Sequence, residues 1–367
     1  SSVFEGTGPA EDHRSGRQER VFSVIERVLR RAAEIRPVLL SLENIHLAGE
    51  ATFGFLEHLA VGLHCNTAPI LLIATMRSED LEARPMLAEA LQRLSRFGSD
   101  VVRLRLDRLE DSEASQLVQK LVPVDADVAE RIAARAAGNP LHLTQILRYL
   151  HESGKLRFAN GAWRIEDAVD IGSEVPAELG ELLRLRAVRA CVRFKDSNAL
   201  KGILERAAIV GNRFDYRLLY SFIDRSDPSL LAGLDEALEF LVREGVLREI
   251  GHSAEDLLEF NHVVMRDVLL ADLEELRALR DLHRVAAEVK VAFYGSRADQ
   301  HALEIAEHYR RARDGKGVYI HTVKAARSAM AASDLKAAIR LYREAAEIAE
   351  RDDQLAEGLE EHSSAVL

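Results

Sequence analysis

Glu43 has the clearest chemical potential in the sequence because it directly follows a short apolar run, residues 38–42 (VLLSL), bounded by turn signals. Such a run is typical of a buried parallel strand, and open α/β sheets bind ligands beyond the carboxyl ends of their strands. A carboxylate there can hold Mg²⁺, directly or through water, beside a nucleotide phosphate. Alternatively, Glu43 merely ends a strand at the surface, and the spacing alone leaves both interpretations open.

Arg77 stands at the end of a second apolar run, residues 69–76 (PILLIATM). A guanidinium at the tip of such a strand could reach a γ-phosphate, because its planar fork of donors matches phosphate oxygens. A surface arginine without a ligand would fit the same residues. The 13 histidines and two cysteines form no HExxH or CxxC motif, so no zinc site or nucleophile is indicated.

The elements around these residues change character along the chain. Helical and strand-like runs alternate up to residue 110, which predicts a parallel sheet with covering helices. Within this part, residues 1–18 are expected to form a loop and a helix is expected from Gln18. In residues 101–109 (VVRLRLDRL) apolar and polar side chains alternate, which predicts a further strand. Helices follow, broken by Gly138-Asn139-Pro140, and then a hairpin around Asn160-Gly161.

The second half of the sequence is mostly helical. Helices from about 178 to 250, followed by a hairpin that pairs 246–250 with 257–263, make a winged-helix pattern. Beyond residue 265 the periodicity predicts antiparallel helix pairs, 299–313 with 319–332 and 335–350 with a last helix from Asp353, which indicates helical repeats.

The composition favours a multi-domain, mostly α-helical cytoplasmic protein. At roughly 150 residues per domain, 367 residues suggest two or three domains, and the 8 prolines leave long stretches free for helix. No apolar run approaches the roughly 18 residues of a membrane span. The net charge of −11 argues against broad affinity for nucleic acids or anionic membranes.

Residues 37–52 (PVLLSLENIHLAGEAT) resemble the Walker B segment of STAND-type P-loop ATPases, which are signal-transduction relatives of AAA+ proteins. Glu43 matches that family's metal-associated acid. Asn44 stands where the second, water-polarising acid belongs, and an amide can orient a water but cannot take a proton at neutral pH. The resemblance therefore implies weak or absent hydrolysis, whether Asn44 is natural or engineered. The rest of the segment follows the pattern through Ile45, His46, Ala48, Glu50, Ala51 and Thr52, with Leu47 and Gly49 replacing a Trp and an Asp.

Three later motifs resemble the same family in the same order. Residues 70–77 resemble the sensor-1 strand, which implies that Arg77 contacts the γ-phosphate. Residues 138–150 (GNPLHLTQILRYL) resemble the GxP motif, which implies that Asn139 and Pro140 frame the adenine. Residues 257–269 match the pattern F-x-H-x-x-x-R through Phe260, His262 and Arg266. This match implies that His262 senses an ADP phosphate, although a lone histidine is also often structural.

The resemblance covers about residues 18–360 and implies four modules with ATP or ADP and Mg²⁺ as cofactors. These are a partial P-loop NTPase (AAA+/STAND) domain over 1–110, a small helical domain with a hairpin over 111–175, a winged-helix domain over 176–275 and a TPR-like helical arm over 276–367. Residues 332–350 resemble a tetratricopeptide unit, so a protein partner is expected at the arm, and self-association is possible.

The P-loop string G-x-x-x-x-G-K-[ST] does not occur in the sequence, and Gly6-Thr7-Gly8 is followed by Pro9 without a lysine. Because the sequence also lacks an initiator Met, we expect it to begin downstream of the P-loop of a longer regulator. Three functions remain open: a nucleotide-dependent signalling switch, a pseudo-ATPase scaffold that binds a protein through its arm, and an active ATPase completed by missing residues.

The winged-helix pattern does not predict DNA binding. The candidate recognition helix, Asp235–Glu244 or Leu234–Arg243, has a single cation, Arg243. Four acids oppose it within or next to the helix: Asp235, Glu236, Glu239 and Glu244. Such a face would repel phosphate groups, so we exclude DNA binding by this element.

Overall fold

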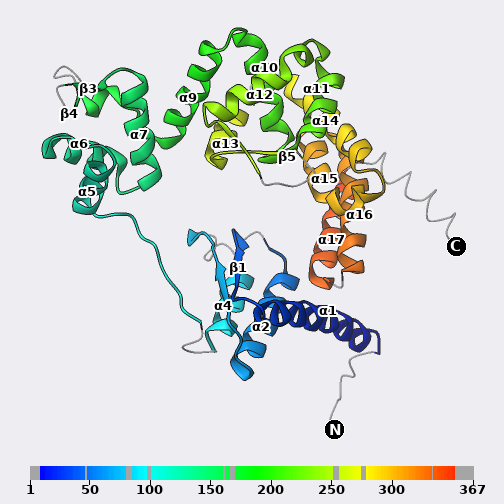
Figure 1. Cartoon of the computed structure of the whole chain (residues 1–367). Coiled ribbons are helices and arrows are strands. Elements are labelled where there is room, and N and C mark those ends of the chain that lie inside the picture. Colours follow the sequence, from blue (N-terminus) through cyan, green and yellow to red (C-terminus); the bar gives the residue numbers. More distant parts are fainter. Residues whose placement is uncertain are drawn as a thin grey trace. The chain divides into compact units, whose positions relative to one another are not determined.

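The protein is mostly helical (Figure 1). It divides into two compact units. The first comprises Ser1–Arg105, Asp299–Leu303 and Val318–Leu367, and the second comprises Leu106–Ala298 and Glu304–Gly317. The computed structural model describes residues 9–45, 48–79, 85–96, 101–159, 162–165, 170–250, 256–273, 278–332 and 334–351. No described helix is both long enough and apolar enough to cross a bilayer.

The first unit begins with a small α/β body. Its elements are α1 (Pro9–Ala33), β1 (Val38–Leu42), α2 (Glu50–Cys65), β2 (Ile70–Ala74) and α4 (Pro85–Leu94). The two strands pair in parallel, with Val38 opposite Ile70 and Leu42 opposite Ala74, which confirms the predicted parallel pairing. Leu42 and Leu72 pack against Phe53 and Leu56 of α2 and against Leu87 of α4, so these helices cover one face of the sheet.

The opposite face of this sheet is open, contrary to the prediction of buried strands. Leu39 is 63% exposed, and its partner across the strands, Leu71, is 60% exposed. Parallel sheets usually have helices on both faces. In the described part of this unit, helices cover only one face of the sheet, so alternate strand residues are exposed. A continuous apolar run in the sequence does not reveal whether one face or both faces of a strand will be covered.

Two further sequence predictions in this body are wrong. Helix α1 begins at Pro9 and not at Gln18, because residues 10–18 are mostly good helix formers that carry no apolar period to reveal them. Residues 101–110 form no strand, although Val102, Leu104 and Leu106 alternate as a strand would. These three side chains are 75%, 82% and 92% exposed, and alternation without a neighbouring strand to pair with does not make a sheet.

The first unit also contains helical residues near the C-terminus. Helices α16 (Gly315–Ala331) and α17 (Leu335–Arg351) match the predicted helices 319–332 and 335–350. Ala325 and Ala326 pack with Leu341 and with Ala302, so small residues allow close helix contacts. The helix predicted from Asp353 lies outside the described residues.

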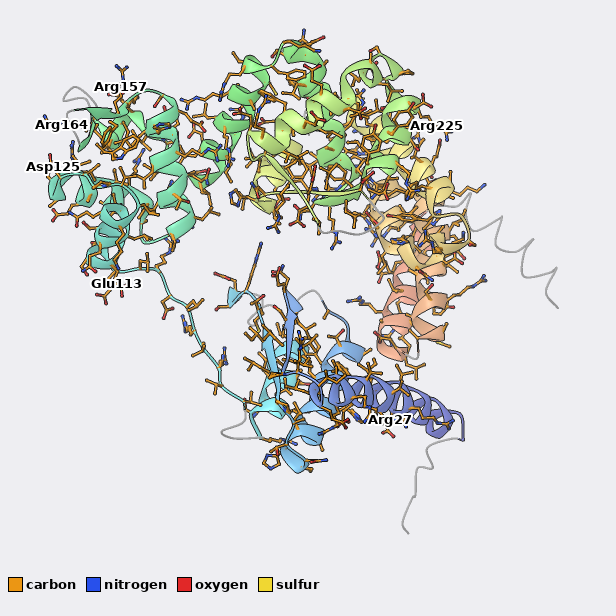
Figure 2. The ribbon with its side chains drawn as sticks, viewed as in Figure 1. Arg27, Glu113, Asp125, Arg157, Arg164 and Arg225 are labelled. Atoms are coloured by element: carbon orange, nitrogen blue, oxygen red, sulfur yellow. The ribbon has the colours of Figure 1, made fainter. Side chains whose placement is uncertain are left out.

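The second unit opens with a helical subdomain formed by α5 (Asp111–Leu121), α6 (Ala126–Ala136), α7 (Pro140–Glu152), the strands β3 (Leu156–Ala159) and β4 (Ala162–Ile165), and α8 (Ile171–Glu174). Glu113, labelled in Figure 2, lies in the first turn of α5. Its Oε2 accepts a hydrogen bond from the backbone N–H of Glu110 at 3.0 Å as part of a capping box. The strands pair antiparallel as predicted, with Phe158 opposite Trp163. Their turn, Asn160-Gly161, lies outside the described residues.

The rest of the second unit follows the element order expected from the winged-helix pattern. Its members are α9 (Leu179–Arg193), α10 (Ser197–Val210), β5 (Arg213–Asp215), α11 (Tyr216–Ser226), the 3₁₀ helix η3 (Pro228–Gly233), α12 (Leu234–Arg243), β6 (Leu247–Glu249), β7 (Leu257–Phe260) and α13 (Val263–Leu273). The strands form an antiparallel sheet in the order β5-β7-β6, and β6 pairs with β7 as predicted. A large apolar core that includes Phe222 and Phe260 holds these elements together.

The next elements are α14 (Ala278–Tyr294), the 3₁₀ helix η4 (Gly295–His301) and α15 (Ala302–Arg311), which belong to the second unit except for Asp299–Leu303. The predicted helix 299–313 therefore begins three residues later, at Ala302, because its expected first turn belongs to the 3₁₀ segment. Helix α14 packs on α10 and α11, which joins this region to the large core.

Candidate functional site

The tips of β1 and β2 carry three of the residues that the sequence singled out. Glu43 and Asn44 follow β1, and Arg77 follows β2. All three therefore lie beyond the carboxyl ends of two paired parallel strands. The backbone N–H of Asn44 donates to Thr75 Oγ1 at 3.1 Å, which ties the two tips together. Glu43 and Arg77 are exposed. The structure thus places the segments that follow the two strands next to each other.

Asn44 has a left-handed backbone with a φ of 56°. Asparagine tolerates this conformation much better than most residues, because its short polar side chain can hydrogen-bond locally. Its N–H is already used by Thr75, and the next N–H, of Ile45, donates to the Thr75 carbonyl at 2.9 Å. The left-handed backbone therefore favours asparagine at position 44, independently of any role toward a ligand.

Asn139 and Pro140 begin helix α7. The Asn139 side chain accepts hydrogen bonds from the backbone N–H groups of Leu141 at 3.0 Å and His142 at 3.2 Å, and Pro140 occupies the first helical turn. An asparagine cap followed by proline is a favoured helix start. The Asn139 carboxamide oxygen is therefore engaged in capping.

Gly138, just before this cap, contacts the segment that enters α5. Its φ is 72°, and its carbonyl accepts a hydrogen bond from the N–H of Leu109 at 2.9 Å. A Cβ at this position would collide with the Leu109 carbonyl and lie 2.9 Å from Cβ of Arg108. The Gly138-Asn139-Pro140 motif therefore both starts α7 and fixes the entry to the helical subdomain.

His262 lies immediately before α13, is half-buried, and stands among cationic groups. Burial is the main cause that lowers its pKa, and the positive charges of Arg186, Arg148 and Arg248 lower it further. The imidazole is consequently neutral at pH 7 and surrounded by positive potential. Its two motif companions are structural, because Phe260 is buried in the core and Arg266 donates from Nε to the Ala208 carbonyl at 2.9 Å.

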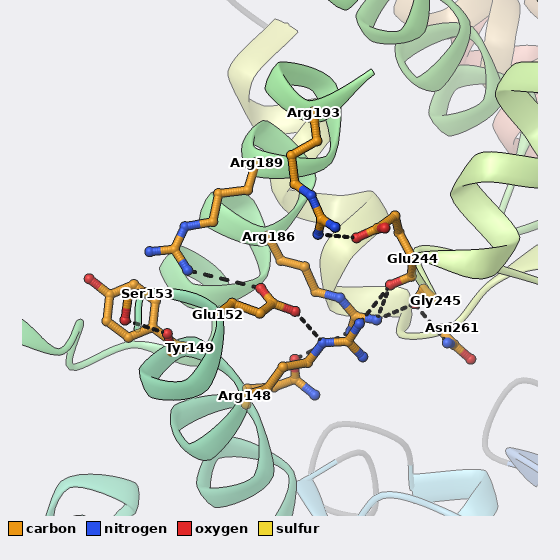
Figure 3. Close-up of polar contacts among 11 residues, drawn as sticks. Arg148, Tyr149, Glu152, Ser153, Arg186, Arg189, Arg193, Glu244, Gly245 and Asn261 are labelled. Carbon is orange, nitrogen blue, oxygen red and sulfur yellow. Dashed lines mark hydrogen bonds and ion pairs between the residues drawn. The ribbon is translucent and has the colours of Figure 1, made fainter. Parts of the chain in front are cut away.

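Arg186 of α9 is the centre of a polar cluster that the sequence did not reveal (Figure 3). It is 7% exposed, and its Nη2 donates to the carbonyl oxygens of Glu244 and Gly245, each at 2.7 Å. Arg148 of α7 donates to the same Glu244 carbonyl at 2.9 Å, and Asn261 donates to the Gly245 carbonyl at 2.7 Å. Burial and the charge of Arg148 lower the pKa of Arg186 to about 10, so it remains charged at pH 7.

This cluster joins three elements of the second unit at one turn. Arg148 and Arg186 come from α7 and α9, and both bind the turn between α12 and β6. Glu152 balances part of the charge by accepting from Arg148 Nε at 2.6 Å. The sequence alone does not identify this cluster, because α9 contains several arginines and only tertiary packing determines which of them is buried.

The predicted site residues fall into two groups. Glu43, Asn44 and Arg77 belong to the first unit, whereas Asn139, Pro140 and His262 belong to the second. Within the second unit, Arg148 lies nine residues beyond Asn139 on α7, about two and a half helical turns. The described residues contain no cluster of three or more His, Cys, Asp or Glu side chains that could hold a metal ion.

Comparison with solved structures adds structural similarity, and comparison with sequence families and curated proteins adds none. No family model matches the chain, and no curated protein matches it. The crystal structure of a signal transduction ATPase with numerous domains (STAND) protein with a tetratricopeptide repeat sensor, from Pyrococcus horikoshii, is similar with a TM-score of 0.46 and 14% sequence identity. The match covers 89% of this chain and 45% of that chain, so this chain spans less than half the length of that protein.

Proposed function

We propose that the chain is a nucleotide-dependent switch module of a larger signalling regulator, with weak or absent ATP hydrolysis. The observation that carries this proposal is the parallel pairing of β1 with β2. Because of this pairing, Glu43 and Arg77 both follow strands at the same carboxyl edge of the sheet. That edge is where open α/β sheets bind ligands. A carboxylate and a guanidinium there suit a magnesium-bound polyphosphate.

The residues at this edge fit a Mg²⁺–nucleotide complex. Glu43 is exposed, and no described residue forms a hydrogen bond or ion pair with its carboxylate, so the carboxylate is free to bind a cation. Protein-bound Mg²⁺ commonly uses one or two carboxylates together with waters and phosphate oxygens. In this proposal Glu43 would hold the cation, Arg77 would contact the γ-phosphate, and Asn44 would orient a water without taking its proton.

His262 would contact an ADP phosphate. Its lowered pKa keeps the imidazole neutral at pH 7, so it would act as a hydrogen-bond donor to that phosphate, within the positive field of Arg148 and Arg186. A ligand that binds one conformation more tightly than another shifts the population toward that conformation. Nucleotide state would thereby set the balance between a closed and an open form, and the arm would relay it to a protein partner.

The open face of the α/β body is consistent with a partial nucleotide-binding domain. Leu39, Leu71 and Ile73 on the sheet are exposed, as are alternate apolar residues from Val102 to Leu106. Leu39 and Leu71 are neighbours across the paired strands, and an exposed apolar patch of this kind marks a site of contact. We propose that further strands, with the phosphate-binding loop, cover it in the complete regulator.

The test is nucleotide binding by the natural gene product that carries this sequence. Isothermal titration with ADP and with Mg-ATP should show binding, and H262A should release a fluorescent ADP analogue faster than the wild type does. The matched control is H151A, which removes an exposed histidine of α7. Absence of ATP and ADP binding would refute the switch, and turnover at ordinary enzyme rates would refute the proposed consequence of Asn44.

The Mg²⁺ role of Glu43 needs its own variant. E43Q should weaken Mg-ATP binding while leaving ADP binding without Mg²⁺ unchanged, because only the metal contact is removed. E79Q is the control, since Glu79 is also exposed and follows the same strand edge. Equal effects of E43Q with and without Mg²⁺ would contradict a metal ligand.

A pseudo-ATPase scaffold is the second candidate, and one observation favours it. Helix α17 exposes Ile339 at 49% and Tyr342 at 40%. A surface cavity of about 450 Å³ on the same helix is lined by Ile339, Arg340, Arg343, Glu344 and Glu347. A scaffold would bind its protein partner there without nucleotide, and charge-introducing variants of Ile339 and Tyr342 would then abolish partner binding in protein that binds neither ATP nor ADP.

A further inference from the structure

A groove of about 350 Å³ lies between α12 and the β6–β7 hairpin of the second unit. Its volume falls within the roughly 300–1,000 Å³ of ordinary ligand pockets. Its floor is apolar and its rim is acidic. The apolar residues are Leu238, Val242, Ile250, Leu257 and Leu258, and the acidic residues are Asp235, Glu239, Glu249 and Asp256, with Tyr216 beside them.

The charge in this groove is uncompensated. Glu239, Glu249 and Asp256 are exposed, and no described cation pairs with their carboxylates. Asp235 accepts a hydrogen bond from the Tyr216 hydroxyl at 2.6 Å, which is the main cause that raises the pKa of Tyr216 to about 12. The tyrosine therefore stays protonated and adds no positive charge, and no lysine or arginine lines the groove in the part that the structure describes.

Acids elsewhere on the same helical region are compensated. Glu236 forms an ion pair with Lys195, and Glu244 pairs with Arg193 at 2.9 Å. Both cations come from α9 or the turn that follows it. Ion pairs thus compensate Glu236 and Glu244, whereas the groove acids Glu239, Glu249 and Asp256 have no described cation as a partner.

We propose that this groove docks a basic amphipathic segment of a partner protein, in which apolar side chains alternate with Arg or Lys. The apolar floor would receive the apolar side chains, and the unpaired carboxylates would bind the cations. Charge complementarity of this kind gives an interface its specificity and speeds association. A nucleic acid is disfavoured because its phosphates would meet carboxylates, and a small cation alone would leave the apolar floor unused. The proposal does not depend on nucleotide binding.

The experiment measures fluorescence anisotropy of a short labelled peptide that alternates leucine with arginine, titrated with the full chain. Two matched peptides replace arginine by glutamate or leucine by serine, and a labelled DNA duplex serves as a fourth probe. The leucine–arginine peptide should bind, and the other three probes should bind at least tenfold more weakly. If the serine–arginine peptide binds equally well, or if DNA binds more tightly, the proposed occupant is wrong.

Variants locate the binding site. The double reversal E239K/E249K should weaken peptide binding roughly tenfold, because two favourable charge contacts become repulsive. The control E181K/D224K makes the same charge change at exposed positions of α9 and α11 outside the groove. Unchanged affinity in the first pair, or equal weakening in both pairs, would overturn the proposal. L257Q tests the apolar floor without changing charge and should also weaken binding, with thermal unfolding used to verify that each variant folds.

Discussion

Arg186 and Gly245 are in contact across the second unit: Nη2 of Arg186 donates to the Gly245 carbonyl at 2.7 Å, and a Cβ on Gly245 would lie 2.6 Å from that nitrogen. The turn between α12 and β6 therefore depends on a residue without a side chain. Since Arg186 comes from α9 and Arg148 of α7 binds the neighbouring Glu244 carbonyl, the position of this turn is linked to that of the helical subdomain.

The first prediction concerns Gly245. Its φ of 65° is in the left-handed region, so G245A should lose about 1–2 kcal/mol from backbone strain alone. Displacement of the Arg186 guanidinium should add to this loss. Thermal or urea unfolding would show a lower midpoint for G245A. The control G54A should not lower it, because Gly54 lies inside α2, where alanine is the better helix former and its Cβ would make only an ordinary contact, 3.4 Å from the Phe22 ring. Equal midpoints for G245A and the wild type would contradict the proposed role of the contact.

The second prediction links Arg186 to His262. The positive charge of Arg186 contributes to the lowered pKa of His262, after burial. R186Q removes that charge, so the pKa of His262 should rise toward its ordinary value. NMR titration of the histidine ring protons measures this shift directly. R184Q is the control, because Arg184 is exposed on the same helix, pairs with Asp272, and is not among the charges that act on His262. An unchanged His262 pKa in R186Q would contradict the geometry.

The sequence predicted local elements well and long-range contacts poorly, for physical reasons. The paired strand tips at Glu43 and Arg77 were predictable, because both follow apolar runs whose parallel pairing fixes where they end. The contact of Arg186 with the Gly245 turn joins positions 59 residues apart. Arg184 and Arg186 are neighbours in one arginine-rich helix, yet only Arg186 is buried, and periodicity does not distinguish them.

The errors also have identifiable causes. Residues 10–18 lack an apolar face, so the first turns of α1 gave no periodic signal. Val102, Leu104 and Leu106 alternate correctly for a strand but have no partner among the described residues, and strand formation depends on pairing as much as on pattern.

The third prediction is a loss of stability in acid. Nδ1 of His283 lies 2.9 Å from Nδ1 of His308, and both rings are buried between α14 and α15. Burial is the main cause that lowers the pKa of His283 to about 4 and the pKa of His308 well below its ordinary value. Nearby Arg311 and Lys290 act in the same direction on both histidines, and Glu307 opposes them at His283.

These lowered pKa values determine how the free energy of unfolding changes with pH. In the unfolded chain both histidines have a pKa of about 6.5, so the unfolded state binds protons first as the pH falls. The stabilising contribution is complete above about pH 6.5 and is lost progressively toward pH 4. Urea midpoints measured at pH 7.5 and pH 5 should therefore fall with acidity. H283Q should reduce that pH dependence, whereas H151Q, which alters an exposed histidine, should keep it; identical slopes for H283Q and the wild type would exclude the pair as the cause.

The fourth prediction separates the structural role of Asn139 from any role toward a nucleotide. Its side-chain oxygen accepts from two backbone N–H groups at the start of α7, so N139A should cost about 1 kcal/mol of stability. N139D should restore it, because a carboxylate also caps the helix and interacts favourably with its dipole. N198A is the control, since Asn198 is exposed in the first turn of α10 and alanine is the better helix former there. If N139D recovers thermal stability and ADP binding together, the motif acts on the nucleotide only through the helix start; if stability returns without ADP binding, the carboxamide itself contributes to the base site.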